Sequence, residues 1–180
     1  RSGLMSAILA RKGLTGARRF LEGRAGFYPV YYRGIHYDVG RLVDALGEKY
    51  EVLNQATKSY PSTGFTNGPI ENVLEIMQKN RLFKEDVGKV VLRVGQRMYN
   101  NTCEPRDSKY RPKTVTDAMF SLPYTIGTAV LRGDVFLEDF SPGAIKDARR
   151  LKEVDKVETM LDQDVEEEVR KLNFEFRLLP

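Results

Sequence analysis

The chain has 180 residues and a mass of 20.6 kDa, which is the size of one domain or of a domain with part of another. Apolar residues make up 41% and charged residues 30%, which excludes a disordered chain, and no apolar run approaches the roughly 20 residues of a membrane span. Twenty-nine Lys and Arg against 25 Asp and Glu leave a net charge of +4, which favours anionic partners in general without indicating nucleic acid.

Short helices that end at glycines are predicted for the first third of the chain. These helices cover residues 2–10, 16–22 and 38–46, and a glycine follows each of them closely. A loop is predicted over residues 24–36 and a strand over residues 50–56.

The chain begins inside an apolar helix, so we expect an upstream part that packs against it. The side chains that need such partner helices are Ile8, Leu9, Leu14, Phe20 and Leu21. We therefore predict that residues 1–50 pack poorly alone and expose an apolar patch.

Longer helices are predicted further along. One begins at Asn67 with Pro69 in its first turn, and its apolar face carries Ile70, Val73, Leu74 and Met77. Two more cover residues 116–131, with a kink at Pro123, and residues 141–154.

Strands are interleaved with these helices at irregular lengths. They are predicted over residues 89–94, 157–161 and 174–179, and a polar loop is predicted over residues 100–113. This order favours an α+β fold that follows an all-helical segment.

Charge is distributed unevenly along the chain. Residues 1–34 hold seven basic side chains and one acidic one, so this stretch is either solvated or faces an anionic ligand or partner. Residues 158–168 hold six acidic side chains and no basic one, which indicates a solvated surface. The basic stretch lacks interleaved aromatic residues on a defined nucleic-acid-binding module, so we expect no nucleic-acid partner. Because no apolar run has the length of a membrane span, we also expect no membrane partner.

The single Cys103 and the single His36 limit the chemistry that the chain can perform. One cysteine excludes an internal disulfide framework and suits a reducing compartment, so we expect a cytoplasmic protein. One Cys and one His argue against a structural zinc site, and no phosphate-binding or dinucleotide-binding motif occurs. Cys103 has no local base, and His36 between two large side chains indicates a structural role.

Two polar side chains stand apart from this background. Lys58 follows a predicted strand and enters a Tyr-Pro turn, where the end of a strand can direct it into a cleft. Tyr124 follows Pro123 inside a predicted helix, where a proline frees a backbone carbonyl and opens space. Taken alone, each residue type at such a position is more often on the surface or in the core.

Several stretches resemble one known family when they are taken together and in order. They are the opening residues 1–16 with Phe20-Leu-Glu-Gly23 and Gly26-Phe27, Lys58-Ser-Tyr-Pro61, Ala118-Met-Phe-Ser-Leu-Pro-Tyr124 and Gly133-Asp-Val135. The sequence resembles the MmgE/PrpD family, which includes 2-methylcitrate dehydratases, cis-aconitate decarboxylases and iminodisuccinate epimerases.

The resemblance implies a larger enzyme with an all-helical domain, an α+β lid and an active site in the cleft between them. Residues 1–50 would be the terminal helices of the helical domain, and residues 51–180 would be the lid. The implied substrates are small di- or tricarboxylates, the implied cofactor requirement is none, and the implied assembly is a homodimer.

The resemblance also implies the site residues. Lys58 and Tyr124 match the family's functional lysine and tyrosine, so they are the predicted catalytic residues. Thr63 and Asn67 occupy the loop where members commonly carry histidine, and they are predicted to bind substrate although neither can titrate. Met119 replaces a frequent lysine of the family.

The expected activity is a lyase-type elimination of water from a small polycarboxylate by acid–base chemistry. Decarboxylation or epimerisation of a related dicarboxylate is an alternative. A non-catalytic binding protein on the same scaffold is a third possibility, which the missing histidines favour.

Overall fold

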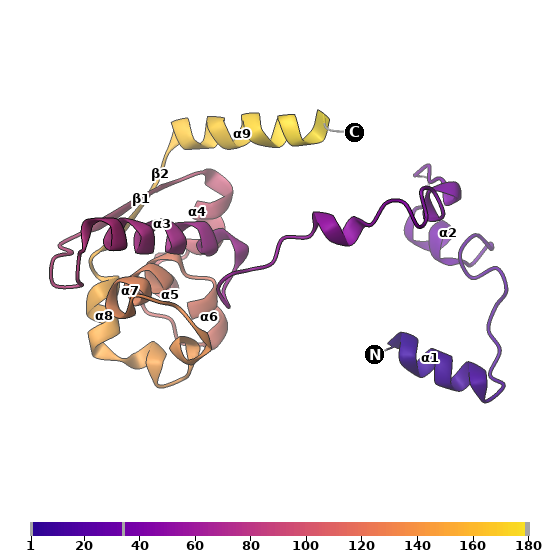
Figure 1. Ribbon diagram of the computed structural model, residues 1–180, viewed down its shortest axis with the longest axis horizontal. Helices are drawn as coiled ribbons and strands as arrows, with labels where there is room; N and C mark the ends of the chain where they lie inside the picture. Colours follow the sequence, from indigo (N-terminus) through magenta and orange to yellow (C-terminus); the bar gives the residue numbers. More distant parts are fainter. Residues whose placement is uncertain (1, 34, 179–180) are drawn as a thin grey trace. The chain divides into compact units, whose positions relative to one another are not determined.

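A computed structural model describes residues 2–33 and 35–178 of the chain (Figure 1). The chain divides into two compact units, Arg1–Gln55 and Ala56–Pro180, which we call unit 1 and unit 2. The sequence places this boundary at residue 50.

Unit 1 consists of short helical segments joined by turns. They are α1 (Ser2–Arg11), α2 (Phe27–Tyr31) and the 3₁₀ turns η1 (Val39–Leu42) and η2 (Glu51–Asn54). The first predicted helix is confirmed by α1, and Gly13 follows it with a left-handed φ of 92°.

The other predictions for unit 1 are largely wrong. The predicted helix over 16–22 is absent, with turns at residues 18–22 in its place, and α2 lies inside the predicted loop. The predicted helix over 38–46 shrinks to η1, and the predicted strand over 50–56 contains η2. Helices this short are marginal without tertiary packing, so local periodicity alone does not determine them.

Unit 1 exposes apolar side chains, as the sequence predicts. No residue of α1 is buried, and Leu21 is half-buried. The other four side chains that were expected to lack partners are exposed: Ile8, Leu9, Leu14 and Phe20. The buried hydrophobic cluster of the described residues runs from Ile70 to Val157 and lies wholly in unit 2.

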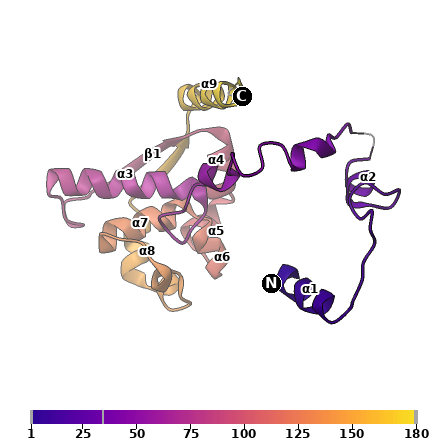
Figure 2. The same cartoon turned by 45° about the vertical axis from the view of Figure 1, so that its right-hand side comes forward.

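Unit 2 is an α+β domain built around one buried helix, α7 (Leu122–Arg132). All of its residues from Leu122 to Val130 are buried. The helix packs between α3 (Gly64–Asn80) and α8 (Ala148–Val154), as both views show (Figures 1 and 2).

In the described part of unit 2, the sheet has two parallel strands, β1 (Val90–Val94) and β2 (Val157–Leu161). Val90 lies opposite Val157 and Val94 opposite Leu161. Both strands confirm the sequence prediction. The chain between the two strands forms the following helical elements: α4 (Gln96–Thr102), α5 (Arg106–Tyr110), α6 (Val115–Met119), α7, η3 (Leu137–Phe140), η4 (Ala144–Lys146) and α8.

The long helix α3 confirms the predicted apolar face. Ile70 and Val73 are buried, and Leu74 and Met77 pack against the core. The helix begins at Gly64 rather than at Asn67, so its proline lies inside the helix instead of in the first turn.

Two predictions between the strands are wrong. The expected polar loop over 100–113 contains the end of α4 and all of α5. The expected helix over 116–131 is split into α6 and α7, because the Ser121 side chain accepts a hydrogen bond from the Tyr124 N–H at 3.0 Å and caps a new helix. Pro123 therefore falls in the first turn of α7, where it removes no hydrogen bond and causes no kink.

The last part of the chain also differs from the prediction. The expected helix over 141–154 is divided into η4 and α8. Residues 174–178, predicted as a strand, belong to the helix α9 (Gln163–Leu178), and residue 179 lies outside the described residues. An i,i+4 ion pair between Arg170 and Glu166 at 3.0 Å supports α9 locally. No helix of the described part is long and apolar enough to cross a membrane.

Candidate functional site

A cavity of about 500 Å³ in unit 2 contains the predicted lysine. Three segments line it: the loop from Lys58 to Thr63, the end of α6 at Met119 and Phe120, and the start of η3 at Phe136 and Leu137. Its walls are therefore hydroxyl-bearing on one side and apolar on the others. Among these lining residues, Lys58 is the only charged one.

Lys58 is exposed at this cavity. Within the described part of the chain, no carboxylate and no hydrogen-bond acceptor pairs with its ammonium group. An ammonium group without a protein partner is a ready point charge for an incoming carboxylate.

The loop that carries Lys58 is held in place by Asn67, on the first turns of α3. The Asn67 side-chain oxygen accepts from the Tyr60 N–H at 3.1 Å, and its nitrogen donates to the Thr63 carbonyl at 3.1 Å and to the Ser62 hydroxyl at 3.3 Å. The amide thus bonds the loop at three points and does not line the cavity. A direct contact between Asn67 and a substrate stays a prediction.

Thr63 does line the cavity, and its backbone ties the loop to α6. Its N–H donates to the Met119 carbonyl at 3.0 Å. Met119, which replaces a frequent lysine of the resembled family, therefore supports the loop through its backbone carbonyl. The Thr63 side chain makes no capping bond to α3. The predicted Lys58 and Thr63 therefore meet at one cavity.

Tyr124 lies apart from this lining. It is fully buried, its hydroxyl donates to the Asp139 carbonyl at 2.5 Å, and its ring contacts Phe140. Burial raises the pKa of Tyr124 to about 12, which keeps the hydroxyl protonated. The structure thus does not bring Tyr124 and Lys58 together at the cavity, and a catalytic role for Tyr124 stays a prediction.

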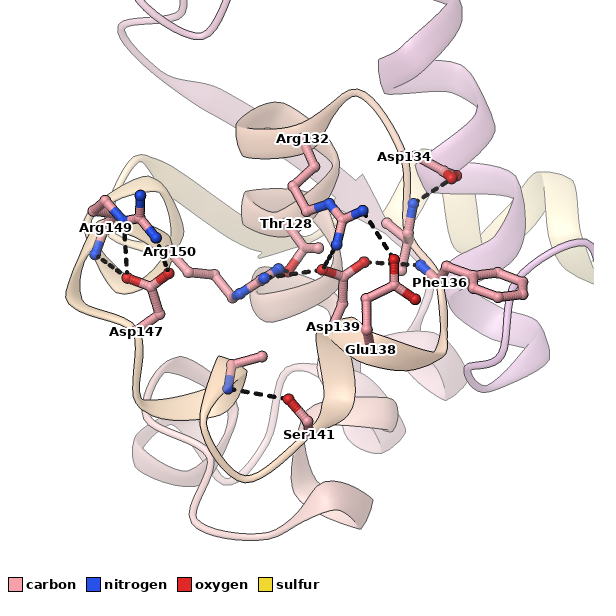
Figure 3. A network of polar contacts seen from close by, with 12 residues as sticks. Thr128, Arg132, Asp134, Phe136, Glu138, Asp139, Ser141, Asp147, Arg149 and Arg150 are labelled. Atoms are coloured by element: carbon pink, nitrogen blue, oxygen red, sulfur yellow. Dashed lines mark hydrogen bonds and ion pairs between the residues drawn. The ribbon is translucent and has the colours of Figure 1, made fainter.

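A buried ionic network surrounds Asp139, which is fully buried (Figure 3). One carboxylate oxygen accepts from Arg132 at 2.8 Å and from Arg150 at 2.9 Å, and the other accepts from the Phe136 N–H at 2.9 Å. Arg150 also donates to the Thr128 hydroxyl at 2.8 Å. The sequence does not reveal this network, because no short motif shows that residues on α7, η3 and α8 meet.

A buried lysine supports the junction between α6 and α7 from another direction. Lys109 donates from its ammonium to the Phe120 carbonyl at 2.9 Å, and the Ser121 hydroxyl donates to the Lys109 carbonyl at 2.5 Å. Desolvation lowers the pKa of Lys109. The sequence pattern does not reveal this lysine either, since it lies where a polar loop is predicted.

Other candidate chemistry is limited in the described residues. They contain no group of three His, Cys, Asp or Glu side chains placed to hold a metal ion. Cys103 is buried, and burial raises the pKa of its thiol, which disfavours the nucleophilic thiolate.

Comparison with known proteins agrees with the resemblance carried by the motifs. The sequence profile of the MmgE/PrpD C-terminal domain matches residues 60–175. A protein of Aspergillus oryzae (strain ATCC 42149 / RIB 40), named cis-aconitate decarboxylase-like protein oryM, is 25% identical over 157 residues. The match covers 81% of this chain and 32% of that protein, so the chain spans about a third of its relative's length.

Proposed function

The chain belongs to the MmgE/PrpD family, and from this membership we propose that it forms the lid of a lyase-type enzyme. The proposed reaction is the elimination of water from a small di- or tricarboxylate by acid–base chemistry. Chemistry without a metal or organic cofactor and a homodimeric assembly are parts of the same proposal.

The unpaired Lys58 ammonium group at the cavity is the observation that carries the proposal. In an elimination, a base removes the proton next to a carboxylate, and an acid protonates the hydroxyl that leaves as water. Lys58 would hold the carboxylate as a point charge. Its ammonium group would also be the lid group placed to exchange a proton with the substrate.

Decarboxylation of a related acid is the second candidate. The name of the Aspergillus oryzae relative, a cis-aconitate decarboxylase-like protein, favours it. In that reaction the bond to one carboxyl carbon breaks, carbon dioxide leaves, and a proton replaces it on the substrate carbon. Lys58 would then deliver the proton or hold the carboxylate that remains. Epimerisation needs the same proton removal followed by return of a proton to the opposite face of the carbon.

A non-catalytic binding protein is the third candidate, from a different class. Neither Thr63 nor Asn67 titrates, and the Asn67 amide is engaged by its own loop. A lid site that binds an anion through Lys58 and has no second acid–base group is what a non-catalytic binding protein would need.

Incubation of the full-length protein with 2-methylcitrate, citrate or cis-aconitate distinguishes the candidates. We expect unsaturated-acid absorbance to rise with a hydroxy acid, without release of carbon dioxide. Carbon dioxide released from cis-aconitate would support the decarboxylase instead. Citrate binding by calorimetry without turnover of any of the three acids would overturn the enzyme proposal and favour the binding protein.

A further inference from the structure

One wall of the Lys58 cavity is formed by side chains that core packing does not hold. Phe136 and Leu137 line the cavity and are 53% and 61% exposed. The buried Val135 and Phe140 anchor the two sides of this segment in the core. Between these anchors, the position of the wall depends on its backbone contacts.

The Asp139 carboxylate fixes this backbone. One of its oxygens accepts the Phe136 N–H at 2.9 Å, and the Asp139 N–H donates in turn to the Phe136 carbonyl at 3.1 Å. In Figure 3 the Phe136 nitrogen faces Asp139 while its ring points away from the network. The orientation of the Asp139 carboxylate therefore determines where the Phe136 backbone, and with it this cavity wall, lies.

Arg150 fixes the carboxylate from the opposite side. It is only 5% exposed, and its guanidinium donates both to Asp139 at 2.9 Å and to the Thr128 hydroxyl at 2.8 Å. The guanidinium also lies over the Tyr124 ring, 5.7 Å from its centre. Thr128 in turn donates to the Tyr124 carbonyl at 2.8 Å, and Arg132 of α7 donates to Asp139 at 2.8 Å. Both partners of Arg150 are therefore held by contacts of α7.

We propose that Arg150 is a positioning residue that acts through Asp139 to hold the Phe136–Leu137 wall of the Lys58 cavity. It touches neither substrate nor Lys58, and its role rests on the proposed function of that cavity. Arg132 already supplies a second positive charge to the same carboxylate oxygen, so the distinctive contribution of Arg150 is orientation. Stability alone does not explain the buried ion pair, because proteins in which apolar residues replace such a pair are often equally or more stable.

The first test compares two arginine variants of α8 in the full-length protein. Arg150→Met removes the donors and keeps the apolar stem. We expect at least tenfold faster amide hydrogen exchange in residues 133–141, with exchange in α3 unchanged. With the acid that the wild type turns over, we expect KM to rise more than kcat falls. Arg149→Met is the matched control, since the Arg149 side chain is exposed and, among the described residues, bonds only Asp147; it should leave exchange and kinetics unchanged.

The variant Arg150→Lys tests whether the planar guanidinium group, with its several N–H donors, is needed. Lysine offers one point charge and cannot span Asp139 and Thr128 with fixed geometry. We expect Arg150→Lys to restore the urea midpoint of unfolding more fully than it restores KM. Equal and complete recovery of both would overturn the orientation role.

A double variant keeps the proposal testable if Arg150→Met unfolds. Asp139→Leu combined with Arg150→Met replaces the buried pair by apolar groups and removes the acceptor for the Phe136 N–H. We expect a near wild-type urea midpoint, with exchange in residues 133–141 still fast and KM still raised. Wild-type exchange and kinetics in this folded variant would overturn the proposal.

The exchange measurement also separates this proposal from the assignment of the cavity. If Lys58→Ala kept full turnover, the proposed function of the cavity would fail, and with it the link from the wall to substrate. Fast exchange in Arg150→Met would still support the structural half of the proposal, the hold of Arg150 on residues 133–141.

Discussion

At the scale of single residues, Lys58 is set apart by what surrounds it. The rest of the cavity lining carries hydroxyl and apolar groups, so a bound carboxylate would find one cation there. Replacing this cation should therefore affect turnover more than any other single change in the lining.

We expect Lys58→Ala to lower turnover by about two orders of magnitude or more, the usual scale for an acid–base group. Lys58→Arg keeps the charge and cannot release a proton near neutral pH, so it separates a point charge from an acid–base role. Lys79→Ala is the control, because Lys79 pairs with Glu75 on the exposed face of α3. The measurement is steady-state turnover of the full-length protein, and unchanged turnover in Lys58→Ala would contradict the assignment.

Tyr124 leads to a prediction about stability. Tyr124→Phe leaves the buried Asp139 carbonyl without its donor, which should lower the free energy of unfolding by about 1–3 kcal/mol. The pKa of Tyr124 is raised in the folded state to about 12, so its stabilisation is complete below pH 10, the ordinary pKa. It is then lost as the pH rises toward 12, because the unfolded state gives up the proton first.

Urea unfolding of wild type and Tyr124→Phe at pH 8 and pH 11 checks this sign. The difference between the two proteins should be smaller at pH 11. A difference that stays constant or grows would show that the hydroxyl is not protected in the way that its burial indicates.

At the scale of elements, the sequence predicted those whose pattern is local and repeated. The apolar face of α3 and both strands follow from side-chain spacing alone. In contrast, α4 and α5 carry many polar residues, and their burial depends on distant partners. The Tyr110 hydroxyl, for instance, donates to the Val157 carbonyl at 2.8 Å, a contact that no local pattern predicts.

The candidate site divides in the same way. The turn around Lys58 could be found from its motif, because a continuous loop supplies it together with Thr63. The network of Asp139, Arg132 and Arg150 could not, because it brings three elements together in space. The burial of Tyr124 likewise follows from the packing of α7 against its neighbours, which a single helix pattern does not specify.

The contact between α7 and α8 gives a prediction at this scale. A Cβ atom added at Gly127 would lie 2.7 Å from the Val154 backbone nitrogen, so the two helices would have to move apart. Gly127→Ala should lower the free energy of unfolding by about 1–3 kcal/mol, as other overpacked sites do.

Gly68→Ala is the matched control on α3. A Cβ atom there meets nothing within 4 Å, so the change should stabilise the protein by about 0.5–1 kcal/mol through the backbone entropy of glycine. Urea unfolding of both variants measures whether each change lowers or raises the free energy of unfolding. An unchanged free energy of unfolding in Gly127→Ala would contradict the close approach of the helices.

At the scale of the whole molecule, the two units differ in what holds them together. The buried hydrophobic cluster of the described residues lies in unit 2, whereas unit 1 exposes most of its large apolar side chains. Local opening should therefore cost less free energy in unit 1 than in unit 2.

Limited trypsin digestion of the 180-residue chain measures this difference. Exposed basic residues such as Arg11, Arg18 and Arg24 should be cut first, and the surviving fragment should begin near Lys58. Mass spectrometry of the early fragments identifies the cuts. First cleavage within α7 or α8 would show that the buried cluster does not protect unit 2.

The parallel pairing of β1 with β2 has a consequence for synthesis of the chain. Val90 pairs with Val157, which is synthesised much later, so β1 leaves the ribosome long before β2 has been translated. At typical translation rates this delay is on the order of several seconds, during which the strand presents unpaired backbone groups to other nascent chains. Lys89 beside the strand and Arg93 within it place positive charges on this segment, which discourages association between nascent copies until β2 arrives.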